Sequence, residues 1–136
     1  MLRSLSRYVL LALAIAFLPI SATAQSWPEK LATIDGDGWV EEQDVKRFET
    51  LLPAIQRKYP EEGDQRVADV TVRGWELLEK RGVNMSLLKL MEGMNRAAPT
   101  IGTNVKYQKA VGMYVVFRSV ESYSHFEAVV AVRHEL

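Results

Sequence analysis

Apolar residues recur along most of the chain at the spacing of an amphipathic helix. They return every three, four or seven positions over residues 39–59 and again over residues 64–81, which predicts two helices. Pro53 is predicted to end or kink the first of them, because proline lacks an N–H group. Pro28 suits a first helical turn and predicts a brief helix over residues 27–33. The periodic residues of the two longer helices are Val40, Val45, Phe48, Leu51, Leu52 and Ile55, then Val67, Thr71, Trp75 and Leu78.

A further helix is predicted from Asn84 or Ser86 to about Ala98, where Pro99 and Gly102 stop it. This helix carries more apolar residues than the single stripe of an amphipathic helix requires. We therefore expect its excess apolar face to be exposed and to dock a partner protein. The residues of this expected partner surface are Leu87, Leu88, Leu90, Met91 and Met94.

The C-terminal segment, residues 107–135, fits two structures. Its apolar spacing fits a long helix, whereas residues 114–120 and 126–132 are rich in β-branched and aromatic side chains. The latter pattern is typical of a β-hairpin that turns at residues 122–124, but no Gly, Asn or Pro marks that turn. We favour helix, so the predicted fold is an all-α bundle of about four helices. The alternative is an α+β fold with a C-terminal hairpin.

The first 24 residues have the pattern of a cleavable signal peptide. Arg3 and Arg7 precede an almost unbroken apolar run over residues 8–20, and Ala22 and Ala24 form an A-x-A cleavage site. The run is shorter than the roughly 20 residues of a membrane-spanning helix. We therefore expect export to the periplasm or beyond, with no stable membrane insertion after cleavage.

Composition adds few functional clues. Residues 25–136 are enough for one domain with its own core. They carry fifteen basic and seventeen acidic side chains, a net charge of −2, which gives no general attraction to nucleic acid. The chain contains no cysteine, so thiol and cysteine–zinc chemistry are excluded.

One loop, residues 33–44, has the spacing of calcium ligands. With Thr33 as the first position, acidic residues occupy the third, fifth, ninth and twelfth positions, and Gly38 takes the sixth, where a sharp turn is needed. Val40 takes the eighth position, which is expected to be buried. The predicted ligands are Asp35, Asp37, the Trp39 carbonyl, Glu41 and Asp44.

These residues resemble the calcium loop of EF-hand proteins, and the closing Asp44 followed by a basic helix looks like the dockerin version. The resemblance covers this loop alone. Thr33 replaces the usual first aspartate, and no second loop is found, although such loops normally come in pairs. The resemblance implies a weak calcium site. The competing interpretation is an acidic turn in which Asp35 or Asp37 caps the following helix.

No catalytic motif emerges from the sequence. We expect a non-enzymatic binding or accessory protein whose partner is another exported protein, with a calcium-dependent structural module as the second hypothesis. A small hydrolase that uses His125 and carboxylates is a third, and it requires a cleft that gathers His125 with two carboxylates.

Overall fold

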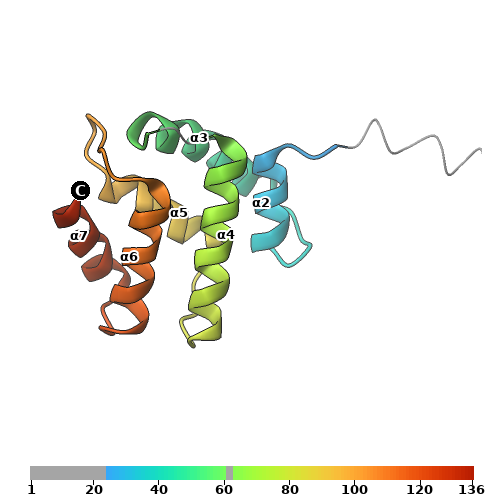
Figure 1. Ribbon diagram of the computed structural model, residues 1–136. Coiled ribbons are helices and arrows are strands. Elements are labelled where there is room, and N and C mark those ends of the chain that lie inside the picture. The colour runs from blue at the N-terminus through green and yellow to red at the C-terminus, as the bar shows by residue number, and fades with distance from the viewer. Residues whose placement is uncertain (1–23, 61–62) are drawn as a thin grey trace, which may run out of the picture.

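The computed structural model describes residues 24–60 and 63–136, and the regular structure of this part of the chain is entirely helical (Figure 1). The expected signal peptide lies outside the described residues, except for Ala24. The all-α prediction is confirmed, with six helices in the described residues where about four were expected. They are α2 (Trp27–Asp35), α3 (Glu42–Lys58), α4 (Asp64–Lys80), α5 (Leu87–Ala97), α6 (Tyr107–Ser119) and α7 (His125–Glu135).

The helix boundaries follow local chemistry. Ser26, Ser86 and Ser124 cap α2, α5 and α7, each accepting a hydrogen bond from the backbone N–H three residues later. Helix α3 starts three residues later than predicted and continues through Pro53 to Lys58. No described helix is long and apolar enough to cross a membrane.

The C-terminal segment forms two helices rather than one helix or a hairpin. The chain breaks at residues 120–124, where Ser122 adopts a positive φ of 58°. Tyr123 N–H donates to the Phe117 carbonyl and the two rings stack with centroids 5.5 Å apart, which fixes the bend. The favoured single long helix is therefore wrong, and the turn that the hairpin alternative placed at residues 122–124 joins two helices instead of two strands.

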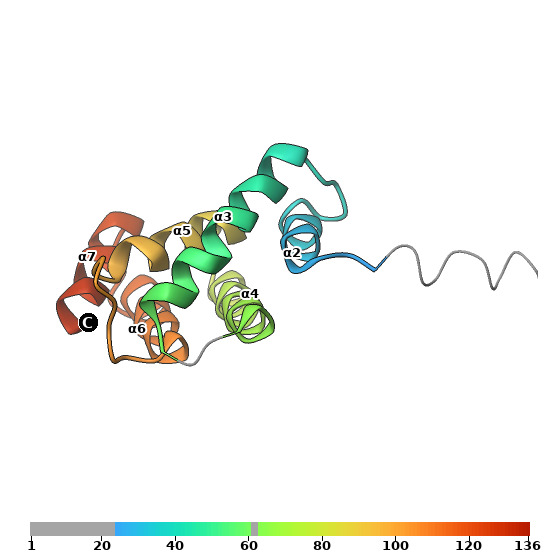
Figure 2. The same cartoon turned by 90° about the horizontal axis from the view of Figure 1, so that it is seen from above.

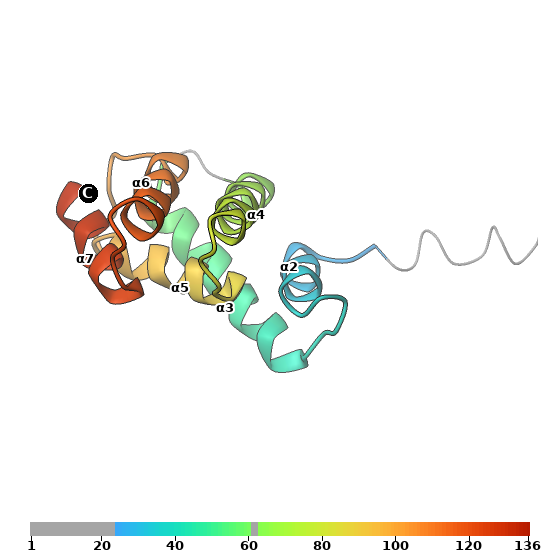
Figure 3. The ribbon, with the colours of Figure 1, turned by 90° about the horizontal axis from the view of Figure 1, so that it is seen from below.

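Helices α4 and α6 run beside each other, and α5 lies across them (Figures 1 and 2). Helix α5 packs against α2, α3, α4 and α7, with α2 at the end of the molecule away from α7 (Figure 3). The core is built around α5, most of whose residues are buried.

The prediction of an exposed partner surface on α5 is wrong. Its five residues are all buried, between 0% and 6% exposed. The extra apolar positions exist because neighbouring helices cover α5 on several sides, so its apolar surface is wider than one stripe. The residues concerned are Leu87, Leu88, Leu90, Met91 and Met94.

The contact between α4 and α6 depends on Gly74. A Cβ atom at this position would lie 2.5 Å from Cγ1 of Val111, whose β-branched side chain has little freedom to move. Gly112, one residue along on α6, faces open space instead. Gly74 and Gly112 therefore have different roles, because of these two only Gly74 allows the close crossing of α4 and α6.

Replacement of each glycine by alanine tests this difference. We expect Gly74→Ala to lower the free energy of unfolding by about 1–3 kcal/mol through overpacking against Val111. Gly112→Ala is the matched control and should raise it by about 0.5–1 kcal/mol, because alanine favours a helix. Urea unfolding followed by tryptophan fluorescence measures both. Changes of the same sign in the two variants would contradict the close crossing.

Candidate functional site

The predicted calcium loop is shorter in the structure than in the sequence pattern. Thr33 and Asp35 belong to the last turn of α2, and the Thr33 hydroxyl donates to the Glu29 carbonyl at 2.8 Å. The chain then turns through Asp37 and Gly38, with φ values of 52° and 88°. The first and third positions of the pattern are therefore helical rather than wrapped around an ion.

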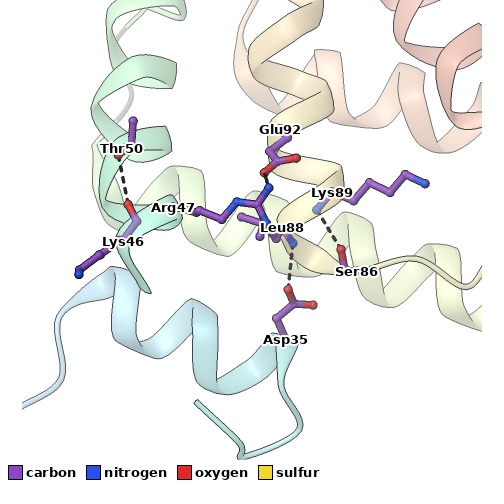
Figure 4. Close-up of polar contacts among 8 residues, drawn as sticks. All are labelled: Asp35, Lys46, Arg47, Thr50, Ser86, Leu88, Lys89 and Glu92. Atoms are coloured by element: carbon purple, nitrogen blue, oxygen red, sulfur yellow. Dashed lines mark hydrogen bonds and ion pairs between the residues drawn. The ribbon is translucent and has the colours of Figure 1, made fainter. Parts of the chain in front are cut away.

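Asp35 caps a helix far away in the sequence. Its two carboxylate oxygens accept hydrogen bonds from the backbone N–H groups of Leu87 and Leu88, at 2.7 and 3.2 Å, at the first turn of α5. Figure 4 shows the bond from Leu88. A carboxylate is stabilising there because the N-terminus of a helix has free N–H groups and a positive dipole end. The cap is on α5, not on the following helix α3, whose Glu41 makes no side-chain capping bond.

The other loop positions do not gather around one point. Val40 is 45% exposed, so the expectation of a buried eighth position is wrong, and Trp39 is 78% exposed. The Trp39 carbonyl lies against Gly36, where a Cβ atom would be 1.8 Å from its oxygen. Over the described residues, no three acidic or histidine side chains are placed to hold a metal, and Asp37, Glu41 and Asp44 form no such group. Calcium binding by the loop stays a prediction.

A shallow groove lies between α4 and α6, with a volume of about 240 Å³. Its floor consists of Val70, Val111 and Val115, which are buried, and its sides include the partly exposed Leu77 and Val116. Both its glycines are helical, and the space above Gly112 is open. The groove is thus an apolar surface that the described chain leaves uncovered.

The rim of this groove is basic. Arg66 and Arg73 lie seven residues apart on one face of α4, Arg81 follows the last residue of this helix, and no carboxylate lines the groove. Arg66 contacts Gln108 of α6, and Arg81 donates to the Ser119 hydroxyl of α6 at 2.9 Å. Contacts with α6 therefore hold both arginine side chains in place. The groove therefore combines an apolar floor with a positively charged edge.

His125 is a titratable side chain outside the groove that is held by a buried neighbour. Its Nδ1 lies 2.7 Å from the Oη atom of the buried Tyr114, which also accepts a hydrogen bond from Arg118 Nε at 3.2 Å. Burial of the ring, followed by the charges of Lys89, Arg118 and Arg96, lowers the pKa of His125. All the charged groups that shift the pKa of His125 are therefore positively charged side chains.

The hydrolase hypothesis required two carboxylates beside His125. The hollow that this residue lines contains none; its other residues are Arg96, Phe126, Val129, Val130 and Arg133. Glu121, four residues before His125, precedes α7, so its carboxylate does not share a helix with His125. The arrangement supplies neither a carboxylate to orient the imidazole nor a second one to act as an acid.

Comparison of the chain with protein-family models, curated proteins and solved structures found no match. The site therefore has to be interpreted from its own geometry.

Sequence reasoning missed the α4–α6 groove, although two signals were present. Arg66 and Arg73 recur seven residues apart, and isolated glycines at 74 and 112 interrupt helical patterns, which often marks a packing or functional position. Neither signal says that the two helices are neighbours, because that contact joins segments about 40 residues apart.

The cap on α5 is tested by Asp35→Asn with Asp37→Asn as its matched control. The amide introduced by Asp35→Asn presents N–H groups toward a backbone N–H, so we expect unfolding to become easier by about 1–2 kcal/mol. Asp37 makes no such contact and asparagine tolerates its positive φ, so the control should stay within about 0.5 kcal/mol of the original. Thermal melts with calcium and with a chelator complete the test. A calcium-dependent rise in Tm that both variants abolish would instead identify a calcium loop.

The depressed pKa of His125 predicts a pH dependence of stability. Because the unfolded chain takes up a proton near the ordinary pKa of 6.5 and the folded chain does so only at lower pH, stability is complete above about pH 6.5 and falls as the pH drops below it. We expect His125→Gln to reduce this slope between pH 7.5 and 5.5. Urea unfolding at several pH values measures it, and an unchanged slope would contradict the assignment.

Proposed function

We propose that the chain is an exported, non-enzymatic binding protein that holds an acidic amphipathic helix of another exported protein in the α4–α6 groove. The single observation that carries this proposal is the uncovered apolar floor between α4 and α6 beside three arginines. Export rests on the pattern of residues 1–24, as predicted from the sequence.

A helix suits the groove because of its shape. Gly112 has no atom within 4 Å of where its Cβ would lie, so an approaching backbone meets no side chain there. The apolar strip continues along α6 through Val116 to Val120, which are 45% and 64% exposed and four residues apart. An elongated apolar strip between two helices matches the apolar face of a third helix.

The charge of the groove specifies the flanks of that helix. No ion pair is found for Arg73 within the described chain, and no carboxylate is among the residues that line the groove. Glutamate or aspartate beside the apolar seam of the partner would pair with Arg73. Such pairs increase the association rate and the specificity more than the affinity.

A designed peptide provides a direct test. We expect a fluorescent amphipathic peptide of about 20 residues, with glutamates flanking a Leu/Ala seam, to bind with an affinity that falls as salt is added. The same peptide with lysines in place of glutamates should bind at least about tenfold more weakly, a difference of about 1.4 kcal/mol. Fluorescence anisotropy measures both.

Two variants locate the peptide. Gly112→Met fills the open space on the groove and should abolish binding, whereas Gln65→Met places the same side chain on an exposed position of α4 that does not line the groove. Circular dichroism confirms that both variants are folded. Equal binding by the two variants, or equal binding of the acidic and basic peptides, would refute the proposed function.

A further inference from the structure

A second hollow lies between α5 and α7, and it shares no residue with the α4–α6 groove. Its volume is about 180 Å³, the space of roughly six water molecules at ~30 Å³ each. This size fits a small organic molecule. Two arginines and a histidine line one part of it and apolar side chains the other. These residues are Arg96, Arg133 and His125, and Phe126, Val129 and Val130.

The hollow is built on a rigid support. His125 is the first residue of α7, where Ser124 and Glu127 form a reciprocal capping box. Its ring meets Tyr114 edge-on, with centroids 5.8 Å apart, and lies so close to Gly93 that a Cβ atom there would be 2.8 Å from Cε1. The ring is therefore held in place before any ligand arrives.

The hydrogen bond to Tyr114 uses only one nitrogen of the imidazole. Because Nδ1 is engaged, Nε2 is the ring nitrogen left to donate to a ligand. In the tautomer with the proton on Nε2, the Tyr114 hydroxyl donates to Nδ1 while Arg118 Nε donates to the hydroxyl oxygen. The Tyr114 hydroxyl also lies 3.4 Å from Sδ of Met85, but a thioether is a weak acceptor, so the shorter contact to Nδ1 favours the tautomer with an Nε2–H donor.

The charges around the hollow are unbalanced. From α5 come Lys89 and Arg96, from α6 Arg118, and from α7 Arg133, whose Nη2 donates to the Arg96 carbonyl at 2.7 Å. The Arg96 guanidinium itself has no hydrogen bond or ion pair within the described chain.

Two acidic side chains on the same helices are engaged with other groups. Glu92 on α5 pairs with Arg47 at 3.2 Å, and Glu127 on α7 bonds the Ser124 backbone. No carboxylate is among the described residues that line the hollow, so an anion from outside would meet its positive charge directly.

We propose that this hollow binds a small organic anion, a carboxylate or a phosphate monoester joined to a compact apolar group. The anionic oxygens accept hydrogen bonds from Arg96 and from His125 Nε2. The apolar group lies on Val129 and Val130 and under the ring of Phe126, which is 76% exposed at the edge of the hollow. A planar apolar group suits the Phe126 ring, which favours stacked or edge-on contacts.

Three probes of similar size distinguish the contribution of charge to binding from that of apolar contact. We expect phenylacetate or phenyl phosphate to shift the ¹H–¹⁵N resonances of the first turn of α7 and the last turn of α5 in a saturable manner. The comparison of these two shows which anionic group is preferred. 2-Phenylethanol, which keeps the ring but has no charge, should bind at least about tenfold more weakly, as loss of a charged hydrogen bond predicts.

Matched variants assign the site. Arg96→Gln and His125→Gln should each weaken the binding of the preferred anion by about tenfold or more. Arg73→Gln removes the same charge from an exposed position in the other groove and should leave binding unchanged. Arg96 is exposed, so its variant is expected to fold even if His125→Gln is destabilised. Binding of neither anion, equal binding of 2-phenylethanol, or an equal effect of Arg73→Gln would overturn the proposal.

Discussion

The polar contacts that secure the two ends of α5 constrain the rest of the fold. A helix inside a protein leaves N–H groups at its start and carbonyls at its end, and burial without partners is costly. Asp35 from α2 accepts from the first turn. At the other end, Tyr59, Lys58 and Arg133 donate to three successive carbonyls, those of Met94, Asn95 and Arg96, at 2.7–2.9 Å. The acidic and basic partners also match the helix dipole, so α2, α3 and α7 are all tied to one central helix.

This arrangement determines which apolar surface stays exposed. Because α5 occupies the interior, its leucines and methionines are covered on several sides. Helices α4 and α6 pack on each other and on the core, yet no described helix covers the groove between them, where Leu77 and Val116 remain 40% and 45% exposed. The same apolar composition that suggested a binding face on α5 thus belongs to the core, and the uncovered face lies on two helices whose apolar patterns were unremarkable.

Local patterns predicted most of the helices and little of the sites. Periodicity placed α4, and periodicity together with the Ser86 cap placed α5, to within a few residues, because both signals depend on neighbours in the sequence. The break at Ser122 was missed by the favoured prediction of one long helix, since no Gly, Asn or Pro marks it, and only the hairpin alternative placed a turn there. The role of Asp35 was out of reach, because its partners lie more than 50 residues away and a short acidic motif fits a calcium loop equally well. Tertiary contacts decide between such alternatives.

Both proposed sites lie beside a helix crossing that a glycine makes possible. Gly74 brings α4 against Val111 of α6, and Gly93 brings α5 against His125 and Val129 of α7. At such a crossing the backbones come close, so the side chains just beyond it stand apart and leave a hollow. The residues exposed there cannot shift inward to fill it, because the crossing itself is already close-packed. Each hollow is therefore a consequence of the packing that stabilises the domain, and a side chain added at either crossing would disturb the fold and the site together.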